Sequence, residues 1–254
     1  MPFVVSTPHV VDAGTICTEC NNRFVTTTPP TDGRSALREE RRRAILEAAR
    51  ALATEHGADG FTVEQVASRA GVSRRTVFNH VAGLDQLLVA VCEQILAEAT
   101  VDLLGEVERR TADLPAGGAG GRAALDAVAE ATRGVDLPTA IATIHRVLGS
   151  PEIGDERAQG ISRTAFDHVG GRLRQQLVHR APGLDPVDLE IGLALLFSGI
   201  VTIAGLWLEQ HPDLAPDVPP EARADWDALL DRVLVRLRIG HAGRPARLAH
   251  RLHH

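Results

Sequence analysis

Residues 61–81 place strong limits on the fold of this 254-residue chain, because they contain two helix starts separated by one tight turn. Thr62 and Ser73 are each placed to cap a helix, since their side-chain oxygens can accept hydrogen bonds from the free N–H groups of a first turn. Gly71 lies between them and can adopt the left-handed backbone conformation that ends one helix and turns the chain into the next. The segment therefore predicts two short helices joined at a sharp angle.

Neighbouring side chains support both helix starts. Gln65 is placed to complete a capping box with the first cap, and Phe61 can pack onto Val66 across that cap. Val72 and Val77 repeat the hydrophobic contact around the second cap. Two helices joined by a short turn that contains glycine form a helix-turn-helix, whose second helix lies in the major groove of DNA.

The charge of this region differs from that of the rest of the chain. Residues 65–84 contain no Asp or Glu, although the whole chain has a formal net charge of −6. The same window contains Arg69, Arg74, Arg75 and His80. All 27 basic residues of the chain are Arg, so the arginine content carries less weight than the absence of carboxylates. The window predicts a surface for phosphate.

The second helix of the predicted pair has an inward and an outward face. With Val77 inward, a rotation of about 100° per residue puts Arg75 and Asn79 outward, with Thr76 and Phe78 beside them. Arginine can bond guanine and asparagine can bond adenine, each pair contributing about 1–3 kcal/mol of discrimination. Two arginines on a helix are more often a solvated face, but the caps, the turn and the charge all favour DNA binding. The predicted DNA-binding residues are Arg42, Arg43, Thr62, Ser73, Arg74, Arg75, Thr76, Phe78, Asn79 and His80.

The remaining sequence predicts helices throughout. No strand-like alternation of useful length occurs, and aromatic residues make up only 3% of the chain, which suits closely packed helices of Ala, Leu, Val and Ile. We predict an all-α fold with a small N-terminal helical unit and a larger helical body. A first helix beginning near Ser35 is followed by the two short ones, and the later helices are predicted at 83–107, 122–133, 137–148, 155–180, 186–210 and 221–238.

Residues 38–88, and especially FTVEQVASRAGVSRRTVFNHVAGLDQLL, resemble the DNA-binding domain of the tetracycline-repressor (TetR) family of bacterial transcription regulators. The resemblance covers a first helix with its terminal glycine (AILEAARALATEHGADGFT), the AGVS turn and the start of a fourth helix at LDQLL. The chain departs from the family pattern at Phe78, where Tyr is common, at Val81, where Phe is common, and at Leu84, where Lys usually contacts phosphate. These changes predict a weaker sequence-independent affinity for DNA.

The resemblance implies a domain organisation and a mechanism. It implies a three-helix DNA-binding domain at 34–82 and a body at 83–240 that dimerises and binds a small effector, flanked by an arm at 1–33 and a tail at 241–254. In a homodimer the two recognition helices lie about one DNA turn apart, roughly 34 Å. Effector binding then changes their spacing and releases a palindromic operator.

Further residues are predicted for the body. The resemblance implies that the segments 186–210 and 221–238 pack against a partner subunit, with packing inside a single chain as an equal alternative. The predicted interface residues are Trp207, Trp226, Leu230, Val233 and Leu237. The predicted effector-binding residues are His145, Arg146, Phe166, His168 and Phe197, and the abundance of Ala, Leu and Val indicates an apolar effector.

One apolar segment raises a different possibility. Residues 191–208 contain no charge and have the minimum length of a membrane span. Because no Lys or Arg cluster flanks the segment and no second segment resembles it, we predict a buried helix and no membrane partner. A membrane-associated helical protein is the alternative.

Other classes of function receive less support. No helix carries paired carboxylates or a nucleophile beside a base, so we predict no catalytic residues, no cofactor and no enzyme. Cys17 and Cys20 form a lone CTEC, which is a weak metal signal, and we predict no metal site. Three cysteines and the absence of a signal-peptide pattern predict a cytoplasmic protein. We therefore predict a homodimeric, effector-responsive repressor of a double-stranded DNA operator; an activator uses the same contacts and stays open.

Overall fold

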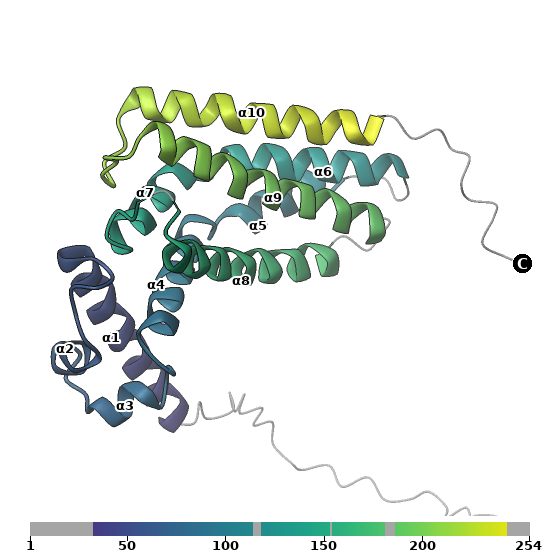
Figure 1. Cartoon of the computed structure of the whole chain (residues 1–254). Coiled ribbons are helices and arrows are strands. Elements are labelled where there is room, and N and C mark those ends of the chain that lie inside the picture. Colours follow the sequence, from purple (N-terminus) through teal and green to yellow (C-terminus); the bar gives the residue numbers. More distant parts are fainter. Residues whose placement is uncertain (1–32, 114–117, 153, 181–185, 243–254) are drawn as a thin grey trace, which may run out of the picture.

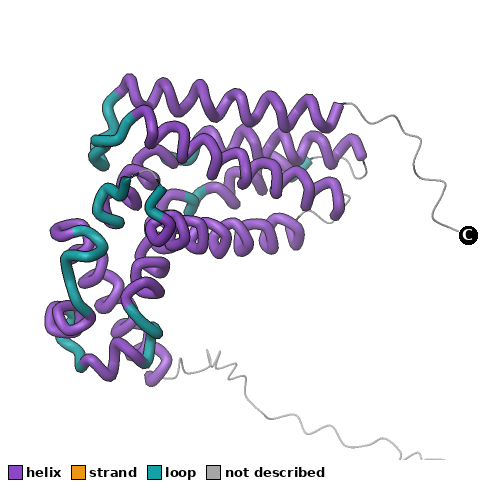
Figure 2. The backbone as a smooth tube through the Cα atoms, viewed as in Figure 1, coloured by secondary structure: helices purple, strands orange, loops and turns teal. Residues whose placement is uncertain are grey.

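The computed structural model describes residues 33–113, 118–152, 154–180 and 186–242. These residues form helices and loops without a strand (Figure 2), which confirms the predicted all-α fold. The predicted N-terminal arm lies outside the described residues except for Gly33, and most of the predicted tail lies outside them too. The helices are α1 (Gly33–His56), α2 (Val63–Arg69), α3 (Arg74–Phe78), α4 (Leu84–Ala99), α5 (Leu103–Thr111), α6 (Gly118–Arg133), α7 (Leu137–Val147), α8 (Glu156–Arg180), α9 (Pro186–Gln210) and α10 (Pro220–Ala242).

The helices separate into a small unit and a body (Figure 1). Helices α1, α2 and α3 lie together at one end of the molecule, and α4 extends from them into the body, where it packs along α8. Helices α6, α9 and α10 pack against one another on the far side of the body. Helix α4 therefore connects the two parts directly.

The prediction of one helix over 83–107 is wrong, because the chain breaks after Ala99. Thr100 closes α4 by donating its hydroxyl to the Leu96 carbonyl at 2.8 Å, and the Leu103 N–H then bonds to the Thr100 carbonyl at 3.1 Å. This turn leaves Val101 71% exposed and buries Leu103 in the core. The turn contains neither Gly nor Pro, so the sequence has no strong break signal at this point.

One continuous hydrophobic core runs through both the small unit and the body. In the small unit, Ile45 on α1 is buried with Phe61, Val66 and Val77, and all of them belong to the same continuous core. In the body, the indole rings of Trp207 and Trp226 meet edge to face with centroids 5.5 Å apart. The Trp207 Nε1–H donates to the Ala222 carbonyl at 2.7 Å, so this buried polar group is satisfied.

The small unit is joined to the body by an arginine and by a close backbone approach. Arg157 on α8 donates to the Asp85 carboxylate at 2.6 and 2.9 Å and also to Asp59 in the loop before α2. Beside it, Gly57 and Gly149 both have positive φ, and a Cβ added to Gly57 would lie 3.0 Å from the Gly149 Cα. Asp59 precedes α2 and Asp85 follows α3. Helix α8 of the body therefore contacts the chain just before and just after these two helices.

Candidate nucleic-acid interface

The first cap of the small unit forms as predicted. The Gln65 N–H donates to the Thr62 hydroxyl at 3.3 Å, and the Thr62 N–H donates to the Gln65 side-chain oxygen at 2.8 Å. Phe61 and Val66 are both buried in the core on either side of this capping box. The start of α2 is therefore set by local contacts that the sequence already specifies.

The turn after α2 is closed by Gly71. Its φ is +66°, its N–H bonds to the Ser68 carbonyl at 3.2 Å, and the next N–H, from Val72, bonds to the Ala67 carbonyl at 3.0 Å. This pair of bonds is the Schellman arrangement that ends a helix. Ser73 then caps α3 by accepting from the Thr76 N–H at 3.1 Å, which confirms the second predicted cap.

Replacing Gly71 with Ala is expected to lower the free energy of unfolding by about 1–2 kcal/mol, because a Cβ is unfavourable in the left-handed backbone conformation. An added Cβ at this position has no other heavy atom within 4 Å, so backbone strain is the cause. Denaturant unfolding measures the loss. Gly83→Ala is the matched control, since Gly83 is equally open but extended, with a φ of 171°. Equal losses in both variants would contradict this explanation.

Helix α3 presents an exposed face opposite its packing face. Val77 and Val81 are buried, whereas Arg75, Phe78 and Asn79 are exposed. Arg75 has no ion-pair partner in the described part of the chain, so its guanidinium is available to a ligand. Thr76 is half-buried, and its hydroxyl lies 2.8 Å from that of Ser73, which reduces its availability for base contacts.

Two other arginines of the window are already paired. Arg74 lies 2.9 Å from the Glu64 carboxylate, and Arg69 donates to both oxygens of Glu55 at 2.6 and 2.7 Å. The Arg69 hydrogen bonds hold the pKa of the Glu55 carboxyl below its usual range. Both carboxylates come from outside residues 65–84, Glu64 directly before that window and Glu55 ten residues before its start, so the charge of the window alone did not predict these pairs.

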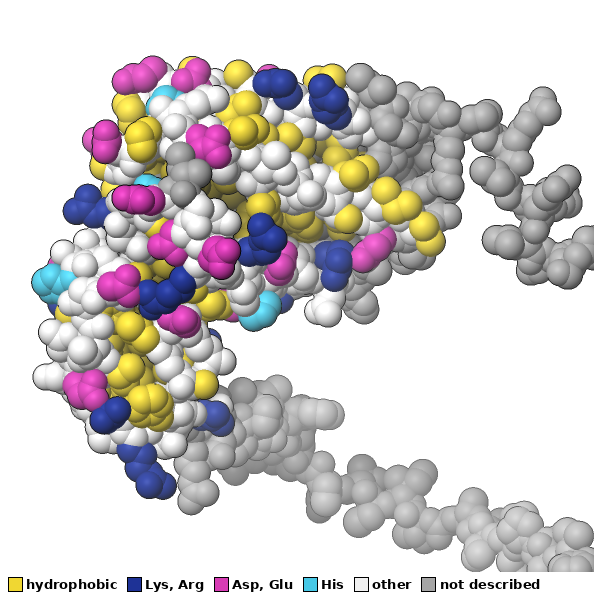
Figure 3. Space-filling model, viewed as in Figure 1, with side chains coloured by type: hydrophobic (Ala, Val, Ile, Leu, Met, Phe, Trp, Pro, Cys, Tyr) yellow, Lys and Arg dark blue, Asp and Glu magenta, His cyan; other side chains and the backbone are white. Residues whose placement is uncertain are grey.

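A second basic group lies where α1 approaches the end of α3. Arg38, Arg41 and Arg42 have no ion-pair partners among the residues that the structure describes, and all three are close enough to influence His80. Burial, and then the charges of Arg38, Arg42 and Arg41, lower the pKa of His80. His80 is therefore largely neutral at pH 7, so the positive charge here comes from α1. Arg43 lies 3.8 Å from Glu47 and remains exposed. Figure 3 shows Arg side chains at the end of the small unit farthest from the body.

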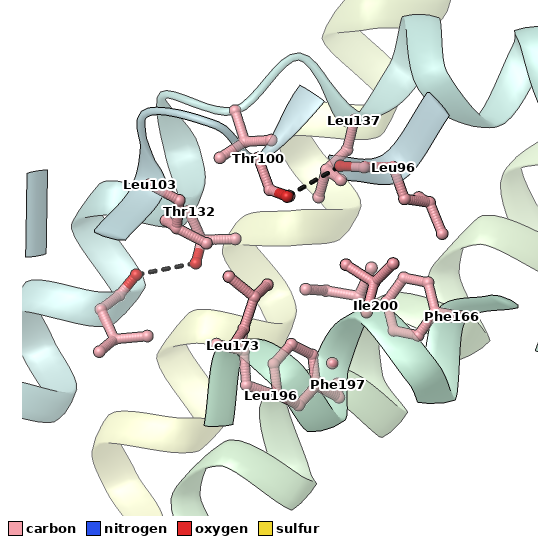
Figure 4. A pocket seen from close by; sticks show the side chains of 14 residues that line it. Leu96, Thr100, Leu103, Thr132, Leu137, Phe166, Leu173, Leu196, Phe197 and Ile200 are labelled. Carbon is pink, nitrogen blue, oxygen red and sulfur yellow. Dashed lines mark hydrogen bonds between the residues drawn. The ribbon is translucent and has the colours of Figure 1, made fainter. Parts of the chain in front are cut away.

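The body contains a cavity among α4 to α9, with an empty volume of about 540 Å³ that includes its open mouth (Figure 4). No charged side chain lines it. Its polar side chains are Thr100 and Thr132, whose hydroxyls donate to the carbonyls of Leu96 and Val128 at 2.8 Å each. Each hydroxyl oxygen retains the capacity to accept a hydrogen bond from a ligand.

Of the five predicted effector-binding residues, two line the cavity and three do not. Phe166 and Phe197 line it with rings edge to face at 6.1 Å, whereas His145, Arg146 and His168 do not line it. Arg146 is exposed, and His168 has its Nδ1 2.6 Å from Glu93 Oε1 on the surface. Burial lowers the pKa of His145, which lies on α7. The sequence did not reveal that aliphatic residues from several helices enclose the space.

The predicted interface residues pack inside the single chain. Trp207, Trp226, Leu230 and Leu237 are buried, and Val233 is half-buried against Gly199. In the single chain these residues therefore lie as expected from the alternative interpretation, packing within one chain. A different set of apolar residues is exposed on α9 and α10, as Figure 3 shows along this side of the body. We name Val187, Ile191, Leu195, Leu206 and Val235 the α9 face.

Other kinds of site have little support in the described residues. No group of three or more His, Cys, Asp or Glu side chains there could hold a metal ion, and Cys17 and Cys20 lie outside this part of the chain. Cys92 is buried, and burial raises the pKa of its thiol to about 12, so it is no nucleophile at neutral pH. Within the described helices, Glu190–Gln210 alone is long and apolar enough to cross a membrane, and 33% of its apolar window is buried inside the chain, so the predicted buried helix is only partly covered.

Residues 45–91 match the family model described as "Bacterial regulatory proteins, tetR family". The match includes both caps, the Gly71 turn and the beginning of α4, and it confirms the predicted resemblance. No curated protein matches the sequence.

The solved structures to which the chain is similar include several regulators. A TetR-family transcriptional regulator from Streptomyces coelicolor is 22% identical, with 78% of this chain and 99% of that chain covered and a TM-score of 0.45. A putative TetR-family transcriptional regulator from Mesorhizobium loti is 16% identical, with 78% and 97% covered and a TM-score of 0.48. SmeT, the repressor of the Stenotrophomonas maltophilia multidrug efflux pump SmeDEF, is 22% identical, with 77% and 89% covered and a TM-score of 0.39. The resemblance to the tetR family rests on the match over residues 45–91.

Proposed function

We propose that this chain, whose residues 45–91 carry a tetR-family DNA-binding domain, is a homodimeric repressor released from a two-fold-symmetric operator by a small uncharged effector. One observation carries the proposal: Arg75 and Asn79 lie exposed on the outward face of a capped α3, where side chains of a helix-turn-helix reach base edges. The unpaired arginines of α1 supply charge for phosphate contacts beside them. Regulation of transcription follows from such binding near a promoter.

The α9 face supports the dimer. Val187, Ile191 and Leu195 recur at four-residue intervals on α9, Leu206 follows three helical turns later, and Val235 is exposed on the neighbouring α10. Isolated monomers rarely expose an apolar strip of this kind. A two-fold axis beside α9 would place the same strip of two subunits in contact. The small unit would then occur twice in the assembly, as a symmetric operator requires.

The cavity supports the effector and indicates its chemistry. A lining without charged side chains makes the binding of an ionic group costly, so we expect an uncharged, largely apolar molecule. Thr100 and Thr132 favour a molecule that also carries a hydrogen-bond donor. Helix α4 contributes Leu96 to the cavity at one end and Asp85 to the Arg157 contact at the other, so it is the element through which an effector would shift the small unit.

Filling the cavity is expected to weaken effector binding without loss of DNA affinity. Ile200→Phe adds volume at a buried position of the cavity lining. We expect a neutral hydrophobic fluorophore to bind about tenfold or more weakly, because the packed interior cannot make room for both the larger ring and the fluorophore. Fluorescence titration measures the change. Ile200→Val is the control and should retain binding. Equal fluorophore affinity in the two variants would place the binding site elsewhere.

Footprinting on DNA that flanks the coding sequence, together with duplexes selected from a random pool, tests the DNA-binding function. We expect a two-fold-symmetric protected site that binds about a thousandfold or more tighter than random DNA across a salt series. A reporter gene placed behind that site then separates repression from activation, because the two activities use the same contacts. Uniform weak binding to every duplex would refute the proposal.

A further inference from the structure

Phe78 is a large apolar side chain that the small unit leaves exposed on its reading face. It is 42% exposed, beside Arg75 and Asn79, while Val77 and Val81 fill the packing face of the same segment. The core therefore does not require an aromatic ring at this position. Its ring has no hydrogen-bonding atom, so it cannot contact a phosphate or a base edge through a hydrogen bond.

The ring of Phe78 is in contact with Arg74 in the free chain. The Arg74 guanidinium carbon lies 5.3 Å from the ring centroid, a cation–π distance. Arg74 is itself held by the Glu64 carboxylate at 2.9 Å. Glu64 on α2 therefore contacts Arg74, and Arg74 covers one side of the ring. An ordered aromatic ring loses little conformational entropy when it contacts a ligand.

The major groove contains one apolar group on its base edges, the C5-methyl group of thymine. We propose that Phe78 is a specificity-determining residue that recognises a thymine in each half-site through this methyl group, with Arg74 and Glu64 as its positioning residues. The inference rests on the proposed function, because it requires α3 to enter the major groove. Arg75 on α3 and Asn79 at its C-cap lie on either side of Phe78 in the sequence, so this thymine lies next to the bases that they contact.

Replacing thymine with uracil tests the inference, because uracil lacks the methyl group and retains every hydrogen-bonding atom. Duplexes are first selected from a random pool with the full-length protein, and each thymine of the selected site is then replaced in turn. We expect one position per half-site at which uracil weakens binding about fourfold, the effect of removing one buried methyl group, and about fifteenfold when both half-sites are changed. Uracil at the other positions is the internal control.

The Phe78→Ala variant should bind the thymine and uracil duplexes equally, whereas Phe78→Leu should retain the preference for thymine. Both substitutions are at an exposed position, and unchanged thermal unfolding verifies that the small unit stays folded. A thymine preference that persists in Phe78→Ala, or none in the unaltered protein, would overturn the inference while the proposed function stands. Failure to select any duplex would overturn both.

Discussion

The Leu195→Asp variant is expected to sediment as a monomer. Its affinity for the operator is expected to fall by about a hundredfold or more. Leu195 is 52% exposed in the single chain and lies centrally on the α9 face, so the carboxylate is solvated in a monomer but would be buried between two subunits. Burial of an unpaired charge is costly enough to separate the subunits. A monomer contacts one half-site and loses the gain in effective concentration that links the two.

Sedimentation velocity and footprinting measure these two effects on the same sample. Val101→Asp is the matched control, since Val101 is an exposed valine outside the α9 face, and this variant should remain a dimer. Leu230→Asp should instead unfold the body, because Leu230 is buried within the chain. A Leu195→Asp protein that still sediments as a dimer would place the interface on another surface. Sedimentation of the unaltered protein as a dimer without detergent also counts against a membrane role for α9.

The second large effect is expected from Arg75→Ala, which should lose about 1–3 kcal/mol of discrimination at one base pair in each half-site. The Arg75 guanidinium has no ion-pair partner in the residues described by the structure, so its removal leaves no protein group unpaired. Arg42→Ala should behave differently and weaken binding to operator and random DNA alike, with a lower salt dependence. Arg42 lies on α1 beside His80, away from the reading face.

Binding of single-base operator variants over a salt series distinguishes the two arginines. Arg69→Ala is the control, because Arg69 is occupied by both oxygens of Glu55 and should leave base discrimination unchanged. If Arg75→Ala lowered the affinity for operator and random DNA by the same factor, Arg75 would be a phosphate contact. Its assignment to base recognition would then be wrong.

The parts of the fold that the sequence predicted correctly depend on contacts between near neighbours. The capping box of Thr62 and Gln65, the positive φ of Gly71 and the Ser73 cap each involve residues within a few positions of one another. The rotation of a helix likewise determines that Val77 faces inward while Arg75 faces outward. Such features follow from the covalent order of the residues, so a local pattern is sufficient to identify them.

Contacts between distant segments explain what the sequence did not predict. The pairing of Arg74 with Glu64 depends on the angle between α2 and α3, and the break at Thr100 depends on where Leu103 can be buried. The cavity contains Phe166 and Phe197 but excludes His145, because several helices must pack before its walls exist.

Helix α9 shows most clearly which features follow from the sequence and which follow from the tertiary structure. An uncharged stretch at residues 191–208 is apparent in the sequence, and it predicts a helix that is apolar on nearly all sides. Only the packing of α6, α8 and α10 decides that Trp207 is buried inside the chain while Ile191 and Leu195 remain exposed. Composition determines how much apolar surface a helix has, whereas the arrangement of its neighbours determines which part stays exposed.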